Sequence, residues 1–172
     1  MTNFLHNGYF QCQEKHFIRL HGCDLPLYPL EIKGSESLSN IYTYEIKCFS
    51  KSDNKSLTKL HGTSLSCEIG EKYKSLPSRF IHGVVTKIIY NYDNSMQNSC
   101  IIVLQPEISE LASGKRTRIW TNTTASEIVS TILKNSLFNT PQIRLYEKES
   151  LIEYKIQYKE SDLDFIHRLL SD

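Results

Sequence analysis

The chain has 172 residues and a formal net charge of +1, and hydrophobic residues make up 40% of it. This composition is typical of a folded core and excludes disorder, and near-neutrality gives no global field to attract nucleic acid or an anionic membrane. No stretch approaches the ~18 apolar residues of a membrane helix, and the N-terminus lacks the apolar run of an export signal. We expect one domain or two small ones.

The first two thirds of the sequence are typical of strands. Residues 15–22 and 41–50 alternate between two faces, which predicts half-buried strands. Prolines in 26–34 favour an edge strand or a bulge over a central strand. Residues 57–70 begin with a helical turn that stops at Gly62 and continue as a strand. The predicted buried face of 41–50 consists of Tyr42, Tyr44, Ile46 and Cys48.

A long hairpin is predicted before Pro106. Residues 79–92 are the longest strand candidate, residues 92–99 are a polar turn, and residues 100–106 are the return strand. Together with the earlier strands, they suffice to close a small antiparallel barrel without exposed edges. The long strand is apolar on both faces and is therefore predicted to be covered on both sides, at Val84, Val85, Ile88 and Ile89.

The pattern changes from strands to helices after Pro106. Residues 107–114 predict a short helical turn that its final glycine ends, and 123–138 is the clearest helix. Thr124 and Glu127 form a predicted capping box at the start of this helix.

Two short strands and a last helix are predicted to follow. The strands are residues 142–146 and 152–158, and the helix begins after Ser161 with Asp164 three residues on. Because the chain ends there, we expect the apolar stripe of this helix to stay uncovered, so that the tail frays or docks on another chain. The stripe consists of Leu163, Phe165, Ile166, Leu169 and Leu170.

The domain boundary is placed at Pro106. Residues 1–106 are predicted to form an antiparallel β-barrel domain, and residues 107–172 a partial, truncated α+β subdomain. The fold class is therefore mainly β with an α+β C-terminal part. The scattered cysteines, odd in number, predict reduced, buried thiols without a disulfide, at Cys12, Cys23, Cys48, Cys67 and Cys100.

No motif of a catalytic or metal centre is present. The sequence lacks a glycine-rich phosphate loop, GxSxG, HExxH and paired Cys/His spacing, so we predict no catalytic, cofactor-binding or metal-binding residues and no cofactor. His16 and His21 fall on opposite faces of one strand and cannot chelate one ion from it.

Two places remain as weak candidates for acid–base chemistry. His82 stands beside Gly83, where a strand glycine marks a bulge or a close backbone approach, but a structural imidazole is the favoured interpretation. Glu160, Asp162 and Asp164 form an acidic cluster, which the dipole of the last helix explains without catalysis.

Five sequence blocks occur in the order that is typical of the N-terminal region of VgrG proteins, the spike proteins of type VI secretion. They extend from Leu38 to Leu170, most of the chain, and the last block is long and unusual. The blocks are "LSNIYTYEIKCFS", "LHGTSLSCEI", "RFIHGVVTKI", "IIVLQPEISELASGKRTRIWTNTTASEIVSTIL" and "IQYKESDLDFIHRLLSD".

The resemblance implies a phage tail-hub-like barrel and a mechanical function without catalysis. It implies a trimer of hub subunits on an Hcp-type tube ring, with effectors as cargo and no nucleic acid or membrane span. Such a protein is made in the bacterial cytoplasm and exported by the contractile apparatus without a signal peptide. Arg79 and Gly83 are interpreted as fold-determining, and Ser161, Asp162 and Phe165 as capping and anchoring the last helix.

Three alternatives to a type VI spike component remain open. Because the chain stops at Asp172, where the family continues into a second tube domain and a needle, we expect a truncated N-terminal portion. A phage or phage-derived tail hub or baseplate protein uses the same fold. A non-functional or regulatory fragment would bind a full-length spike or nothing, and a hydrolase would use His82 or the tail acids.

Overall fold

The computed structural model describes residues 7–11, 16–38, 40–72, 77–91, 99–136, 142–146 and 148–171. Contacts divide the chain into two units, residues 1–106 and 107–172. Most of the predicted turn at 92–99 lies outside the described residues, as does Cys12.

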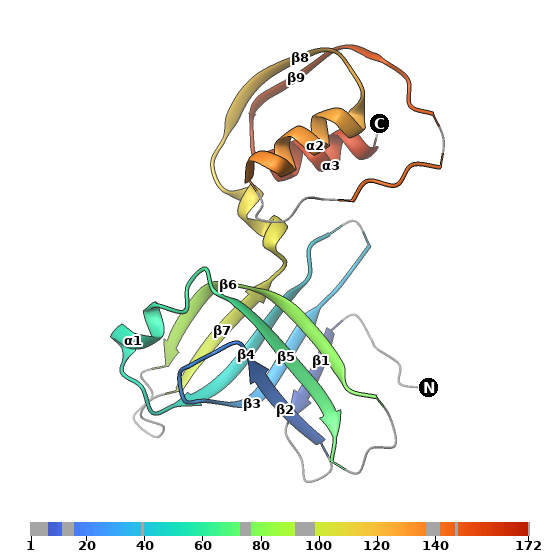
Figure 1. The fold of residues 1–172 in the computed structure, drawn as a ribbon. Helices are drawn as coiled ribbons and strands as arrows, with labels where there is room; N and C mark the ends of the chain where they lie inside the picture. Colours follow the sequence, from blue (N-terminus) through green and yellow to red (C-terminus); the bar gives the residue numbers. More distant parts are fainter. Residues whose placement is uncertain are drawn as a thin grey trace. The chain divides into compact units, whose positions relative to one another are not determined.

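Unit 1 is built on one antiparallel sheet that curls into a half-barrel (Figure 1). Its strands are β1 (Asn7–Gln11), β2 (His16–His21), β3 (Leu27–Ser35), β4 (Thr43–Ser50), β5 (Ser64–Glu71), β6 (Arg79–Asn91) and β7 (Ser99–Gln105). A short helix, α1 (Asn54–Thr58), precedes β5. The strand order is β1-β3-β4-β7-β6-β5-β2, which confirms the antiparallel, mainly β fold. Among the described residues the sheet stays open, with β1 and β2 at its two ends, so the expectation of a closed barrel without exposed edges is wrong.

The core of unit 1 lies against the concave face of this sheet. In β4, alternation buries Tyr44, Ile46 and Cys48, as the sequence predicts. The expectation for the prolines of β3 is met, because the pairing with β4 slips between Pro29 and Glu31 as at a bulge. β1 pairs only with Glu31–Ser35, so among the described residues the part of β3 that holds Pro29 is hydrogen-bonded to β4 alone and lies at an edge of the sheet.

The middle of β6 is buried on both faces, but its ends are not. Val84 and Val85 are both buried beside a register shift that follows Val85. Phe80 and Ile89 are exposed, so the expectation that the whole strand is covered on both sides is wrong. The hairpin of β6 with β7 is confirmed by their antiparallel pairing.

Unit 2 combines a two-stranded sheet with two α-helices and a 3₁₀ turn. Its elements are η1 (Glu107–Ala112), β8 (Arg116–Thr123), α2 (Ala125–Ser136), β9 (Ile152–Glu160) and α3 (Asp162–Ser171). Both helices lie inside the curve of the β8–β9 ribbon (Figure 1). The predicted helices and the strand at 152–158 are confirmed. The predicted strand at 142–146 is wrong, because these residues have no regular structure, and β8 was not foreseen.

Both α-helices of unit 2 begin with the predicted capping boxes. The amide of Thr124 donates to Glu127 Oε2 at 3.0 Å, and the amide of Glu127 donates to Thr124 Oγ1 at 3.3 Å. At α3, the amide of Asp164 donates to Ser161 Oγ at 3.0 Å, and the Ser161 hydroxyl donates to Asp164 Oδ2 at 2.6 Å. The orphan amides of each first turn are thus partly satisfied by side chains.

The apolar stripe of α3 packs inside its own unit. Leu163, Phe165, Ile166 and Leu169 are buried, and only Leu170 is exposed. Residues of η1, α2 and β9 contact α3, so segments that precede the helix in the sequence cover it. The expectation of an uncovered stripe is therefore wrong.

Four of the cysteines are described, and each is a free thiol. Cys48, Cys67 and Cys100 are fully buried in the core of unit 1, and Cys23 is half-buried. Burial raises the pKa of Cys67 to about 12 and that of Cys100 to about 11, because a thiolate loses its hydration there. These thiols act as small hydrophobic side chains.

Candidate functional site

A buried carboxylate joins the strands of unit 2 to the start of α3. Asp162 Oδ1 accepts hydrogen bonds from Arg118 Nη1 at 2.9 Å and from Gln157 Nε2 at 2.7 Å. Arg116 Nε lies 3.4 Å from Asp162 Oδ2. Asp162 and Gln157 are both buried, and a buried charge is tolerated only when it is paired in this way. This cluster is therefore a structural tie and not a free acid.

The other acids of the tail are engaged separately. Asp164 caps α3, and Glu160 Oε1 accepts a hydrogen bond from Arg168 Nη2 at 2.5 Å. This hydrogen bond lowers the pKa of Glu160 below its ordinary value. The same Arg168 nitrogen donates to the carbonyl of Ile156 at 2.8 Å. Each of the three acids, Glu160, Asp162 and Asp164, therefore has its own hydrogen-bond partner, which leaves none of them as a free acid for catalysis.

His82 lies on the convex face of unit 1, in a row of side chains across three strands. Its Nδ1 contacts the hydroxyl of Ser66, and its ring stacks on Phe80 with 6.2 Å between centroids. A catalytic serine–histidine pair also needs an acid that orients the histidine. The nearby Glu68 bonds His21 Nε2 at 2.9 Å instead. Among the described residues, no carboxylate is recorded as bonding His82.

Arg79 joins three segments of the half-barrel. Its Nη2 donates to Glu36 Oε1 at 2.6 Å and to Tyr44 OH at 2.9 Å, and the Tyr44 hydroxyl donates to the same Glu36 oxygen at 2.5 Å. The hydrogen bond from Tyr44, followed by that from Arg79, lowers the pKa of Glu36. Burial and the Glu36 carboxylate raise the pKa of Tyr44. The cluster fixes the start of β6 against β4 and the end of β3.

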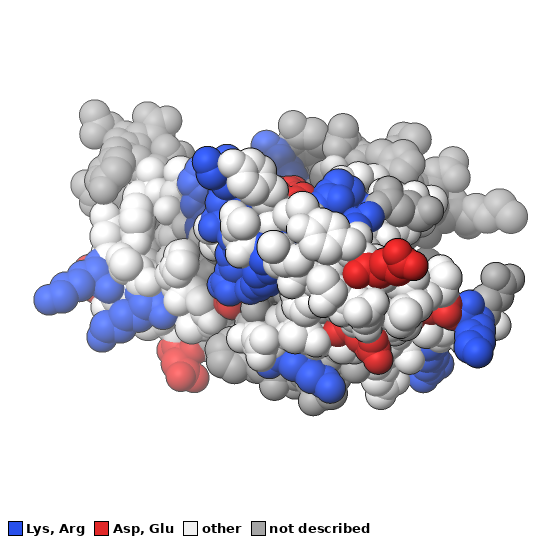
Figure 2. All heavy atoms as spheres, turned by 90° about the horizontal axis from the view of Figure 1, so that it is seen from above, with Lys and Arg blue, Asp and Glu red and all other residues white. Residues whose placement is uncertain are grey.

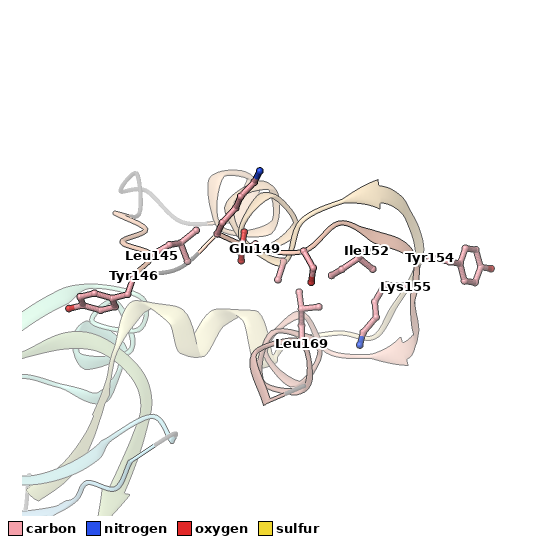
Figure 3. A pocket seen from close by; sticks show the side chains of 10 residues that line it. Leu145, Tyr146, Glu149, Ile152, Tyr154, Lys155 and Leu169 are labelled. Atoms are coloured by element: carbon pink, nitrogen blue, oxygen red, sulfur yellow. The ribbon is translucent and has the colours of Figure 1, made fainter.

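A broad hollow of about 710 Å³ lies within unit 2 (Figure 3). Glu149 closes one side, where its two oxygens accept from the amide of Ser126 at 3.1 and 3.3 Å. Ile152 and Lys155 point into the hollow, whereas Tyr154 points away from it (Figure 3). The carboxylate therefore serves the first turn of α2. The lining consists of Ala125, Leu145, Tyr146, Lys148, Glu149, Ser150, Ile152, Tyr154, Lys155 and Leu169.

The described part of the chain offers neither a metal-ligand cluster nor a membrane helix. Within it, no group of three or more His, Cys, Asp or Glu side chains is placed to hold a metal ion. None of its helices has the length and apolar character needed to cross a membrane.

Sequence reasoning missed three members of these clusters. Ser66 carries no local signal, because only the register of β5 and β6 places it beside His82. Arg118 and Gln157 face each other across β8 and β9, and the charged pattern of β8 did not predict a strand. The available signal was Arg118, a charged residue in a segment to which no element was assigned, together with Asp162, the acid that it binds.

Comparison with known families and proteins places these features in context. A family model described as "Phage tail baseplate hub (GPD)" matches residues 35–172. The type VI secretion system spike protein VgrG1a of Pseudomonas aeruginosa is 28% identical over 160 residues, which cover 88% of this chain and 24% of that protein. The actin cross-linking toxin VgrG1 of Vibrio cholerae is 27% identical over 148 residues, which cover 81% of this chain and 13% of that toxin.

Among solved structures, the Escherichia coli c3393 protein has the same fold. It is described as a component of the type VI secretion system with structural similarity to the T4 bacteriophage tail proteins gp27 and gp5. The match has a TM-score of 0.68 at 24% identity and covers 90% of this chain and 42% of that one. The chain spans about a quarter of VgrG1a. The resemblance to VgrG N-terminal regions is thereby confirmed, and the chain belongs to the phage tail baseplate hub family.

Proposed function

We propose that this chain is a structural component of the hub of a contractile injection apparatus of the type VI secretion kind. The family match over residues 35–172 is the observation that carries the proposal. The half-barrel and the small helical unit supply stiff packing elements. The candidate acids and His82 make hydrogen bonds within the fold. These two observations support a mechanical function without catalysis.

A hub must hold its shape while force passes through it. In unit 1 every strand of the order β1-β3-β4-β7-β6-β5-β2 is hydrogen-bonded to its neighbours, and Arg79 ties the rim. Both signs of charge appear on the surface seen from above, with uncharged areas between them (Figure 2). Such a surface favours docking by shape over long-range attraction.

The partners follow from this proposal. They are other hub or spike subunits, arranged as a trimer, and the end of an Hcp-type tube ring, with effectors as cargo. The chain is made in the bacterial cytoplasm and exported by the apparatus. Because it spans about a quarter of VgrG1a, activities that belong to the rest of that protein are not carried over to it. The same holds for actin cross-linking, since only 13% of the Vibrio toxin is matched.

One neighbouring function has an observation in its favour, because the family description favours a hub in a phage or phage-derived particle. A chain that regulates a full-length hub by binding it is the other alternative that the sequence leaves open. Both keep the chain a structural or binding protein and not a hydrolase.

Binding to the tube ring separates these functions. The purified chain, mixed with the Hcp-type ring protein of the same bacterium, should cosediment with rings and add density at their ends in electron microscopy. Leu170→Asp, at an exposed site, should bind equally. Gly83→Val, which overlaps a backbone carbonyl in the half-barrel, should not bind. The proposal fails if the folded chain ignores the ring and its deletion leaves export of the ring protein unchanged.

A further inference from the structure

The strand β2 lies at one end of the half-barrel sheet and is held from one side only. It pairs with β5 over its whole length, beginning with His16 opposite Glu71, and among the described residues no further strand is hydrogen-bonded to it. A strand at the end of a sheet opens more easily than a central strand, because only one ladder of hydrogen bonds must break. The side-chain contacts between β2 and β5 therefore influence how firmly β2 stays attached.

Three basic side chains of β2 lie against two carboxylates of β5. Glu68 Oε2 lies 2.9 Å from His21 Nε2 and 3.4 Å from Arg19 Nη1. At the start of β2 and on the opposite face of the sheet, His16 Nε2 lies 3.6 Å from Glu71 Oε1. Two of these three contacts involve a histidine, the side chain that ordinarily gains or loses its charge between about pH 5 and 8.

The carboxylate of Glu68 keeps its charge throughout this range of pH. The hydrogen bond from His21, followed by one from Ser78, lowers the pKa of Glu68 below its ordinary value. Only 12% of the Glu68 side chain is exposed, so solvent weakens its contacts less than it would at an open surface. A change of pH between about 5.5 and 8 therefore alters the charge of His21 and leaves that of Glu68 unchanged.

One further histidine titrates on this face of the sheet. His82 of β6 lies on the far side of Phe80, whose ring centroid stands 6.2 Å from the centroid of each imidazole. A charge on His82 repels a charge on His21, so variants must separate the two histidines. The charged side chains of β3, which also contacts β2, are Glu31 and Lys33, and they lie 3.8 Å apart and offset each other.

We infer that β2 is a proton-responsive end strand, which imidazolium–carboxylate pairs hold against β5 in acid and which loosens as His16 and His21 lose their charge. A neutral His21 can still donate from Nε2, so deprotonation removes the charge and not the whole contact. Both histidines are partly exposed, which keeps each pair weak. The response is therefore a change in how often β2 opens, without unfolding of unit 1. It is independent of the function proposed above.

Hydrogen exchange of the full chain at about pH 5.5 and about pH 8, followed by NMR at single amides, tests the inference. The rates are first corrected for the intrinsic pH dependence of amide exchange. The central strand β4 reports changes in the stability of the whole unit, so the protection of β2 is expressed relative to that of β4. We expect this relative protection to fall about two- to fivefold from the lower to the higher pH.

Four variants assign the response to its source. His21→Gln cannot become charged and should reduce the fall to less than about twofold. His21→Lys stays charged at both pH values and should retain most of the protection at the higher pH. His61→Gln is the matched control, because His61 is exposed in the turn after α1 and lies outside β2, and it should leave the fall unchanged. His82→Gln should leave the fall in place or enlarge it.

The outcome in the unmodified chain decides first, so misfolding of a variant does not protect the inference. It is overturned if the relative protection of β2 is the same at both pH values. It is also overturned if the whole fall survives in a folded His21→Gln variant, or if His61→Gln or His82→Gln abolishes it, because the response would then not come from the pairs between β2 and β5.

Discussion

The two units bury their apolar side chains to different degrees. Among the described residues, nine of the fourteen large apolar side chains that remain exposed lie in unit 2, although it is the smaller unit. Unit 1 has a continuous core along the concave face of seven strands, centred on Ile46, Ile102 and Leu104. Unit 2 has only two strands, and a sheet of that size is marginal by itself.

The difference shows what stabilises each unit. Unit 1 depends on close packing within a sheet whose central strands are paired on both sides. Unit 2 depends on a few buried anchors of its helices and on polar ties such as Asp162, because its sheet is covered on one side only. Substitutions in the two units should therefore act by different mechanisms, and this can be tested.

Phe165→Ala should have the largest effect and should act in unit 2. Phe165 is fully buried at the centre of α3, and its truncation leaves a cavity among side chains that cannot collapse fully. We expect a loss of about 3–5 kcal/mol in the free energy of unfolding. Hydrogen exchange with mass spectrometry should localise the loss to residues 107–172. Leu170→Ala, at an exposed position of the same helix, should change stability by less than about 0.5 kcal/mol.

Asp162→Ala tests the polar tie and should cost about 2–3 kcal/mol. The substitution removes the hydrogen-bond acceptor of Arg118 and Gln157. Breaking a fully buried ion pair costs about 3–5 kcal/mol. The smaller value is expected here because the two arginines retain access to solvent. Chemical denaturation measures the loss. Leu163→Ala is the comparison, because it removes an apolar side chain of the same helix. High salt should reduce the loss of stability caused by Asp162→Ala and leave the loss caused by Leu163→Ala unchanged, which would identify the ionic contribution.

Local patterns predicted much of both units. The alternation of 41–50 identified the buried face of β4, and the Thr124 and Ser161 capping boxes located the starts of α2 and α3. These signals are short-range, because the residues that create them are neighbours in the chain or along one strand. The helical turn that stops at Gly62 also depends on local geometry, since this glycine has a φ of +78°.

The predictions that were wrong concern residues whose burial or strand pairing depends on segments distant in the sequence. The stripe of α3 is buried because η1, α2 and β9 cover it, which its own sequence does not reveal. Residues 142–146 alternate like a strand yet have no pairing among the described residues. In β8 the order of charged and apolar residues hides a strand, because Arg118 faces inward to Asp162. Contacts of this kind depend on the register and the tertiary fold.

Gly83→Ala should weaken unit 1 by on the order of 2 kcal/mol, as overpacking of a rigid core does. A Cβ at this position would overlap the backbone carbonyl of Gln105 on the adjacent strand, which cannot move without disturbing the ladder. Thermal unfolding with hydrogen exchange should assign the loss to residues 1–106. Gly62→Ala is the control for glycine replacement without a clash, because nothing lies near its Cβ position and only its positive φ resists.

Ser161→Ala should cost about 1 kcal/mol, a typical value for the loss of a helix N-cap. The amide of Asp164 loses its acceptor, and α3 should exchange its first-turn amides faster. Thr124→Ala is the matched change at α2, where Glu149 additionally accepts from the amide of Ser126. We therefore expect a smaller effect at α2 than at α3. Equal effects at both helices would contradict the view that Glu149 supports the start of α2.

The smallest expected effect is the response of unit 2 to acid through Glu160. Its hydrogen bond with Arg168 lowers the pKa of Glu160 in the folded chain, so the unfolded chain binds the proton more tightly. The stabilisation is therefore fully present above the ordinary glutamate pKa of about 4.3, and it is lost as pH falls through the lowered value. Because 42% of the Arg168 side chain is exposed and solvent weakens the ion pair, the contribution is on the order of 0.5 kcal/mol. Glu160→Gln should remove this part of the acid response in unit 2. The response of unit 1 should persist, because the pKa of Glu36 is lowered there independently. Denaturation at stepwise lower pH, followed by hydrogen exchange in each unit, measures both. An acid response of unit 2 that Glu160→Gln leaves unchanged would show that other carboxyl groups control it.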